Sequence, residues 1–148
     1  YQELLEDSQV DWIYNALPPA LHCEWTIRSL EAGKHVLCEK PLALNYQQAA
    51  EMVTTAKRVG KRLVHATAFP YHPRSSAAKH IMVDRELGDF VRVTMACTFA
   101  DALARPDDHR SQPTLGGGCL LDIGWYCVGA SIWLLGRIPQ RVLAIGKT

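Results

Sequence analysis

The sequence lacks the features that mark several large classes of protein. Its 148 residues carry 16 Lys and Arg against 15 Asp and Glu, so neither charge is in excess and nothing suggests a nucleic-acid or anionic-membrane partner. No apolar run is long enough by itself to span a bilayer, and no basic start followed by an apolar core marks a signal peptide. We therefore expect a cytoplasmic protein that binds neither nucleic acid nor membrane.

The five cysteines form no recognisable metal or redox motif. None pairs as Cys-x-x-Cys, and no Cys/His cluster has the spacing of zinc ligands. Each lies among apolar neighbours, as in Val36-Leu37-Cys38, which is typical of small buried thiols in a reducing compartment. We expect no metal site, and a catalytic cysteine is the less favoured alternative.

The first half of the chain alternates short apolar runs with helical periodicity. Strand character occurs at residues 10–16, 35–38 and 62–66. Helical spacing covers residues 20–32 and a second segment, which Asn45 can cap and Gly60 can end. Strands that alternate with helices of this length imply parallel pairing through right-handed crossovers. Residues 1–70 are therefore predicted to form the second half of a doubly wound α/β sheet.

The pattern changes after residue 70. Residues 90–100 alternate between apolar and polar side chains, which marks a strand with one buried face and is typical of antiparallel sheets. Helices are predicted on either side of it, over residues 73–87 and 119–135. We therefore predict that residues 71–148 form the first part of a second domain, α+β and mainly antiparallel.

Lys40 stands where doubly wound sheets bind ligands. Such ligands lie beyond the carboxyl ends of the strands, and two of these ends are expected at Asn15-Ala16-Leu17-Pro18 and Glu39-Lys40-Pro41. A lysine beside a bound nicotinamide could exchange a proton with a substrate hydroxyl. A solvated surface lysine is the more common explanation of a lone Lys-Pro pair, so this position alone does not decide.

Asp122 and Tyr126 lie four residues apart, so they share one face in the first turns of their helix. The glycines at 116–118 permit a tight turn and a close approach of the backbone. A carboxylate and a phenol side by side can hold and deprotonate a sugar-like hydroxyl. Equally, Asp122 could be a favourable charge at a helix start and Tyr126 a core aromatic, and the pattern does not separate these alternatives.

Three further candidates are weaker. His22, near the start of its helix, could face the crevice or lie on the surface, and His65 at a strand end is as well explained by packing. The Asp107-Asp108-His109 run is predicted to be a solvated loop.

Together these segments resemble the Gfo/Idh/MocA family, named for glucose–fructose oxidoreductase and inositol dehydrogenase. The resemblance covers nearly the whole chain. Its most specific part is Gly33-Lys34-His35-Val36 running into Glu39-Lys40-Pro41, joined at the right separation to the triple glycine with Asp122 and Tyr126. The residues around Tyr14 and Trp25 are most similar to the branch that contains D-xylose dehydrogenases and trans-1,2-dihydrobenzene-1,2-diol dehydrogenases.

The resemblance implies an NADP- or NAD-dependent oxidoreductase that moves a hydride between the nicotinamide and a hydroxyl of an aldose or a related diol. Lys40 would be the catalytic lysine, with a cis bond to Pro41, while Asp122 would hold the substrate and Tyr126 would donate or accept the proton. The residues bordering the cofactor would be Glu39, at its nicotinamide end, and Ala16, Leu17, Pro18 and His22. The fold would be a Rossmann domain followed by a mainly antiparallel open-sheet domain, which binds the substrate and usually assembles the protein into dimers or tetramers.

The sequence departs from the family in its phosphate-binding loop. The family's Gly-x-Gly-x-x-Gly does not occur in it, so we expect this chain alone to bind a dinucleotide weakly and to show little activity. Where the family often has a glutamate and an arginine, this sequence has His65 and Pro70, which leaves the substrate open. The alternative functions are an NAD-dependent glycosidase of the same fold and a non-catalytic dinucleotide-binding regulator.

Overall fold

The computed structural model describes residues 1–84, 87–98, 105 and 107–146. The chain divides into two compact units. The first unit comprises residues 1–67 and 98–125, and the second comprises residues 68–97 and 126–148. Each unit is described by itself, and the predicted domain division at residue 70 stays a prediction.

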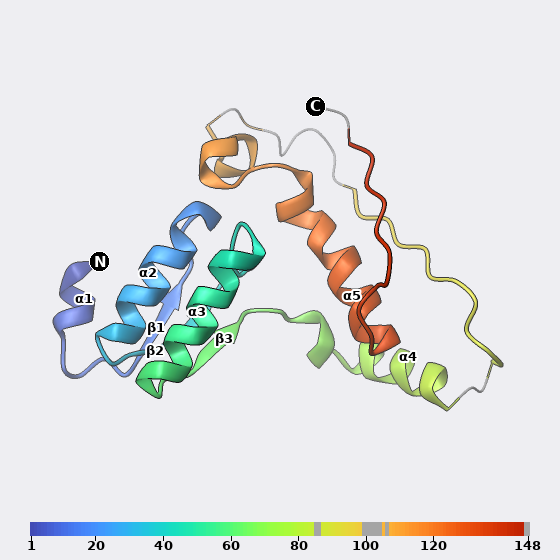
Figure 1. The fold of residues 1–148 in the computed structure, drawn as a ribbon, viewed down its shortest axis with the longest axis horizontal. Helices are drawn as coiled ribbons and strands as arrows, with labels where there is room; N and C mark the ends of the chain where they lie inside the picture. Colours follow the sequence, from blue (N-terminus) through green and yellow to red (C-terminus); the bar gives the residue numbers. More distant parts are fainter. Residues whose placement is uncertain (85–86, 99–104, 106, 147–148) are drawn as a thin grey trace. The chain divides into compact units, whose positions relative to one another are not determined.

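The first unit is built on a parallel sheet with the strand order β1-β2-β3 (Figure 1). The strands are β1 (Trp12–Asn15), β2 (His35–Cys38) and β3 (Leu63–His65). The helices α2 (Pro19–Glu31) and α3 (Tyr46–Val59) connect them. Because both crossovers join neighbouring parallel strands with the same hand, the two helices lie side by side on one face of the sheet (Figure 1). The predicted half of a doubly wound sheet is confirmed.

The register of the sheet aligns the ends of its strands. Asn15 pairs with Cys38, and Cys38 pairs with His65, so the last residues of the three strands form a row. The segments that follow these residues therefore leave the sheet along one edge. This is the edge at which parallel sheets bind ligands.

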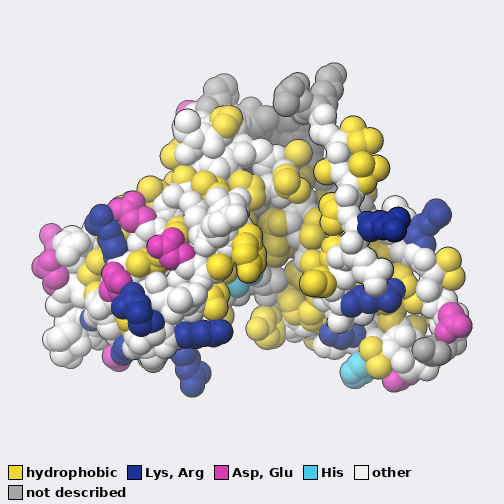
Figure 2. All heavy atoms as spheres, viewed as in Figure 1, with side chains coloured by type: hydrophobic (Ala, Val, Ile, Leu, Met, Phe, Trp, Pro, Cys, Tyr) yellow, Lys and Arg dark blue, Asp and Glu magenta, His cyan; other side chains and the backbone are white. Residues whose placement is uncertain are grey.

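The core of the first unit lies between the sheet and the two helices. Leu30, Val36 and Met52 are fully buried there. The predicted cap and end of α3 are confirmed, because the Asn45 side chain accepts a hydrogen bond from the Gln48 N–H and Gly60 adopts a left-handed conformation. The outer faces of α2 and α3 carry charges of both signs (Figure 2), including the ion pairs Arg28–Glu24 and Arg58–Glu31. The short helix α1 (Gln2–Glu6) precedes the sheet.

The second unit contains α4 (Pro73–Val83) and most of α5 (Trp125–Leu135). The rings of Phe69, which belongs to the short helix η1 (Phe69–Tyr71), and Trp133 pack edge to face with centroids 5.9 Å apart. The ammonium of Lys79 lies 4.5 Å from the centre of the Trp133 ring. These contacts join the two helices.

The predicted strand at residues 90–100 is not observed. Residues 90–98 pair with no strand in the described part of the chain, and residues 99 and 100 lie outside it. A strand is defined by a hydrogen-bonded neighbour, and none of the described segments supplies one. Residues 141–146 likewise pair with no strand in the described part of the chain. Val91 and Leu143 are accordingly 92% and 88% exposed.

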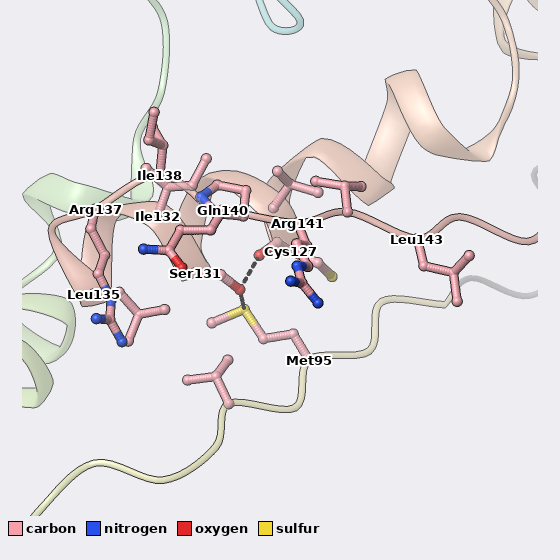
Figure 3. Close-up of a pocket in the computed structure, with 14 residues that line it drawn as sticks. Met95, Cys127, Ser131, Ile132, Leu135, Arg137, Ile138, Gln140, Arg141 and Leu143 are labelled. Atoms are coloured by element: carbon pink, nitrogen blue, oxygen red, sulfur yellow. Dashed lines mark hydrogen bonds between the residues drawn. The ribbon is translucent and has the colours of Figure 1, made fainter.

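An apolar groove runs between α5 and these two extended segments (Figure 3). Val93 and Met95 line it and are half-buried. Thr94, which lies between them in the sequence, and Arg92, which precedes Val93, are exposed. The Ser131 hydroxyl lies 2.7 Å from the Cys127 carbonyl oxygen and 3.6 Å from the Met95 sulfur (Figure 3). Of the apolar side chains on the face predicted to be buried, Val93 and Met95 therefore face the groove, whereas Val91 and Cys97 are exposed. The alternation predicts part of this face correctly, and it does not predict the missing strand partner.

One segment of the described chain, Pro113–Leu135, is long and apolar enough to cross a membrane by length and composition. This differs from the sequence-based expectation that no such segment exists. Core helices of soluble proteins meet the same two criteria, so length and composition do not distinguish them from membrane spans. The backbone of Gly116 and Gly118 has φ values of +83° and +114°, which interrupt the helical path, and Asp122 within the segment carries an ion pair.

Candidate functional site

Lys40 and Asp122 meet at the carboxyl edge of the sheet. Lys40 follows β2 by two residues, and its bond to Pro41 is cis, as the resemblance implied. Its Nζ donates hydrogen bonds to the Asp122 Oδ1 at 2.7 Å and to the Asp122 carbonyl oxygen at 2.8 Å. The two side chains are only 20% and 21% exposed. Two residues that are 82 positions apart thus form an ion pair that is largely shielded from water.

Asp122 lies in a π-helical turn, η5 (Leu120–Gly124), that leads directly into α5. Its N–H donates to the Gly118 carbonyl at 3.1 Å, which ties the turn to the glycines before it. In a π-helical turn each carbonyl pairs five residues ahead instead of four, and such turns occur often at functional sites. Here the turn presents both the carboxylate and the backbone carbonyl of Asp122 to one ammonium group.

The glycines at 116 and 117 allow other segments to approach this turn closely. A Cβ on Gly116 would lie 2.5 Å from the Leu44 Cδ2 and 2.9 Å from the Pro19 Cβ. A Cβ on Gly117 would lie 2.6 Å from the Arg110 carbonyl oxygen. Their function here is therefore close packing of backbone against neighbouring segments, which brings the Asp122 turn to the start of α2.

Arg110 is a second cation beside Asp122, and sequence analysis missed it. Its Nε lies 3.3 Å from the Asp122 Oδ1, and its Nη1 lies 3.3 Å from each carboxylate oxygen of Asp108. Asp108 also accepts from the Arg110 N–H at 2.8 Å and so begins the turn η3 (His109–Ser111). The turn η4 (Pro113–Leu115) follows it. In the predicted solvated loop Asp107-Asp108-His109, Asp107 is exposed, whereas Asp108 and His109 are half-buried. Asp108 holds Arg110 beside the site, and His109 lines it.

A small pocket marks the place where these groups converge. It is lined by Pro19, Lys40, Pro41, His109, Arg110, Gly116, Leu121 and Asp122. All of these residues belong to the first unit. Of these residues, the sequence predicts Lys40 and Asp122 as site residues, but not His109 or Arg110.

The charge of Asp122 is stabilised by its two cationic neighbours. Burial raises the pKa of this carboxyl, but the hydrogen bond and the charge of Lys40, followed by those of Arg110, outweigh it and hold the pKa below its usual value. Asp122 is therefore an ionised acceptor at neutral pH. It can bind a hydroxyl group through a charge-assisted hydrogen bond.

Glu39 lies at the same edge of the sheet, next to Lys40, and forms a hydrogen bond with Tyr14. Tyr14 is a second residue of the site that the sequence did not predict. The Tyr14 hydroxyl donates to the Glu39 Oε1 at 2.5 Å, and the Lys40 N–H donates to its Oε2 at 2.9 Å. Burial raises the pKa of Glu39, but these two hydrogen bonds and the nearby charges of Lys40 and His22 lower it further than burial raises it. The bond to Glu39 raises the pKa of the Tyr14 phenol.

His22 occupies a different place from the one predicted. It was expected to border the cofactor, but its side chain is fully buried beneath the loops that follow β1 and β2. Its Nδ1 lies 2.8 Å from the Pro41 carbonyl oxygen and its Nε2 lies 2.7 Å from the Leu17 carbonyl oxygen. Because both ring nitrogens are engaged and shielded, the ring offers no atom to a bound molecule. Ala16 is exposed, and Leu17 and Pro18 are half-buried, at the edge itself.

His65 and Tyr126 complete the predicted candidates. The His65 Nδ1 lies 2.8 Å from the Thr67 hydroxyl, and its ring packs against Trp125 with centroids 5.2 Å apart. Burial lowers the pKa of His65, as expected for a packed strand-end histidine. Tyr126 begins the part of α5 that belongs to the second unit, and its role stays a prediction.

The cysteines take no part in the site. All five are free, and burial raises the pKa of Cys38 to about 11, which disfavours the thiolate. Cys97 and Cys119 are exposed, so the expectation of burial is wrong for these two. Within the ranges that the structure describes, no three His, Cys, Asp or Glu residues are grouped as metal ligands would be.

The edge suits the nicotinamide end of a dinucleotide. The carboxylate oxygens of Glu39 each hold one hydrogen bond and can accept another from a ribose or amide group. The loop at residues 16–18 offers accessible backbone beside it. These acceptors therefore fit a group that carries hydroxyl or amide donors, whereas the glycine-rich loop that would hold a pyrophosphate does not occur in the sequence.

Two family models match the chain. The model described as "Oxidoreductase family, NAD-binding Rossmann fold" matches residues 1–67, and the "GFO/IDH/MocA C-terminal domain" matches residues 75–148. The predicted resemblance, the fold class and the nicotinamide type of cofactor are confirmed at the level of this family.

The chain is similar to curated proteins and solved structures of known activity. It is 36% identical to a D-xylose 1-dehydrogenase (NADP(+)) of Haloferax volcanii over 97% of the chain and 43% of that protein. It is 32% identical to a trans-1,2-dihydrobenzene-1,2-diol dehydrogenase of Xenopus tropicalis over 99% of the chain and 44% of that protein. A 3-ketoreductase from Actinomadura kijaniata, solved with NADP and TDP-benzene, matches 91% of the chain and 41% of its own at 36% identity, with a TM-score of 0.77. The chain thus spans less than half the length of these relatives.

Proposed function

Because the chain belongs to the GFO/IDH/MocA oxidoreductase family, we propose that the whole protein transfers a hydride between NADP or NAD and a hydroxyl of an aldose or a related diol. The observation that carries this proposal is the Lys40–Asp122 pair at the carboxyl edge of the parallel sheet. A xylose-like sugar or a diol is favoured as substrate because relatives named for these activities align with nearly the whole chain.

Glu39 and the loop at residues 16–18 would hold the nicotinamide end of the cofactor, which supplies or accepts the hydride. Asp122 orients the substrate, because an ionised carboxylate accepts a hydrogen bond from a hydroxyl group and is itself fixed by two cations. The hydroxyl must lose a proton as its carbon loses a hydride. Tyr126 would take this proton as the ionised phenolate and give it back as the neutral phenol in the reverse reaction, and the ammonium of Lys40 favours the negative charge that develops on the oxygen.

Replacing Lys40 by methionine in the whole protein tests this assignment. With D-xylose and NADP or NAD, the unaltered protein should accumulate reduced nicotinamide, while K40M should turn over about 10²- to 10⁴-fold more slowly. Cofactor affinity, measured by quenching of protein fluorescence, should change little. K57M, an exposed lysine on α3, is the matched control and should keep full turnover.

The alternatives give different results in the same assay. With D-xylose, which has no glycosidic bond, neither an NAD-dependent glycosidase nor a regulator would accumulate reduced nicotinamide. The glycosidase, but not the regulator, would release the leaving group of an aryl glycoside added in place of the sugar. Unchanged turnover in K40M would refute the role of Lys40.

A further inference from the structure

His22 forms hydrogen bonds to two loops at once. The carbonyl of Leu17 belongs to the loop after β1, and that of Pro41 belongs to the loop after β2. Both distances, 2.7 and 2.8 Å, are short for a nitrogen and an oxygen, and the ring is completely buried. A single side chain of α2 therefore joins the two strand ends that border the site.

The two acceptors determine which form of the ring satisfies them. A carbonyl oxygen can only accept a hydrogen bond, and a neutral imidazole carries one N–H. The neutral ring would thus place a nitrogen lone pair against one of the two carbonyls, in a buried place where an unmade hydrogen bond destabilises the fold. The ring with protons on both nitrogens makes both bonds. The carboxylate of Glu39 is the negative charge near it.

The backbone of His22 is itself anchored to β1. The amide nitrogen of the buried Asn15 side chain donates to the His22 carbonyl at 3.3 Å and to the Thr26 hydroxyl at 3.1 Å. The Asn15 Oδ1 accepts from the Leu17 N–H at 3.3 Å. The buried Asn15 side chain therefore anchors the backbone that carries the ring and also one residue of the loop after β1.

We propose that His22 is a positioning residue for Lys40: with both nitrogens protonated, it holds the carbonyls of Leu17 and Pro41 and thereby fixes where the Lys40–Pro41 segment leaves the sheet. The proposal rests on the function of Lys40 proposed above. Pro41 directly follows Lys40, so a displaced Pro41 carbonyl displaces the lysine. Displacements of about 1 Å can lower rates by about 10².

Nitrogen NMR of the whole protein, labelled with ¹⁵N-histidine, tests the charge state without any measurement of activity. His22 should show two ring nitrogens that each carry a proton at neutral pH, and its ring signals are assigned in the unaltered protein by through-bond correlation to its own backbone amide. A ring with one protonated nitrogen would overturn the proposal. This measurement uses the unaltered protein and decides even if the His22 variants do not fold.

Kinetics separate a positioning role from a purely structural one. H22N and H22Q can each replace only one of the two bonds, so we expect kcat per folded protein to fall about 10- to 100-fold with a smaller change in cofactor Kd. The matched control is S29A, because Ser29 is also buried in α2 but bonds only to the Trp25 carbonyl of its own helix. S29A should lower Tm and leave kcat unchanged.

The outcomes distinguish this proposal from the proposed function. An unchanged kcat in folded H22N and H22Q would overturn the positioning role. If the unaltered protein oxidises no sugar or diol, the proposed function fails, while the NMR result still decides whether the ring carries two protons.

Discussion

Replacing Lys40 by methionine and Asp122 by asparagine, singly and together, measures the free energy of the ion pair at the site. Two unit charges 2.7 Å apart attract by about 6 kcal/mol at an effective dielectric constant of about 20. Desolvation of both groups offsets much of this attraction, because each side chain is about four-fifths buried. A hydrogen bond to a charged group contributes about 1.5–3 kcal/mol net. We therefore expect a coupling energy of about 1–3 kcal/mol.

Urea unfolding of the four proteins gives this coupling energy as the deviation from additivity. Its pH dependence follows from Asp122, whose pKa in the folded protein lies below the ordinary value of 3.8 despite burial, because Lys40 and Arg110 stabilise the carboxylate. A carboxyl whose pKa is lower in the folded than in the unfolded protein stabilises the folded protein at pH values above its unfolded pKa. This stabilisation is lost as the pH falls through the pKa of the folded protein. The coupling should thus be complete at pH 7 and decline only below 3.8.

Two results would refute this reasoning. A coupling energy below about 0.3 kcal/mol at pH 7 lies within ordinary additivity and would show that the pair contributes nothing to the folded protein. A coupling that persists unchanged in strong acid would show that packing, and not charge, joins the two residues. Asp122 also contacts Arg110 at 3.3 Å, and this contact remains in K40M. Its free energy therefore contributes to the effect of D122N alone and not to the coupling energy between Lys40 and Asp122.

Three further predictions concern single positions. Tyr14→Phe removes a donor to Glu39, so the Glu39 pKa, followed by carboxyl NMR, should rise toward its usual value and cofactor affinity should fall a few-fold. Gly116→Ala should lower the free energy of unfolding, measured in urea, by about 1–3 kcal/mol more than Gly136→Ala. Both glycines have a positive φ, but a Cβ would collide with neighbouring atoms at Gly116 and would meet none within 4 Å at Gly136. Leu30→Ala should cost about 2–5 kcal/mol as a fully buried core residue, and a loss under 1 kcal/mol would place that core elsewhere.

The sheet and helices within residues 1–67 of the first unit are predictable because their signals are local. Asn45 and Gly60 mark the ends of α3 through contacts with residues of the same helix, and the sequence around them predicts both ends correctly. The strand order also follows from local rules, since two crossovers of one hand place consecutive parallel strands side by side. That order is sufficient to place Lys40 at the ligand-binding edge.

The remaining features depend on partners that are distant in the sequence. The alternation at residues 90–98 predicts the inward faces of Val93 and Met95, but a strand also needs a neighbour, and no described segment provides one. The π-helical turn at Asp122 and the attachment of Arg110 to it have no local signature. Both features depend on packing between segments that are distant in the sequence. Neither the composition nor the hydrophobic periodicity of the sequence predicts such packing.

The arrangement of cations around Asp122 explains why a polar loop belongs to the site. Lys40 and Arg110 both donate to the same oxygen, Oδ1, but at 2.7 and 3.3 Å, so the lysine makes the stronger contact. Arg110 does not take over this oxygen because Asp108 accepts from its Nη1 and its backbone N–H. Asp108 therefore keeps Arg110 near enough to stabilise the Asp122 carboxylate and far enough to leave Lys40 as its principal partner. The charge of the loop thus acts on the ion pair and is not simply solvated.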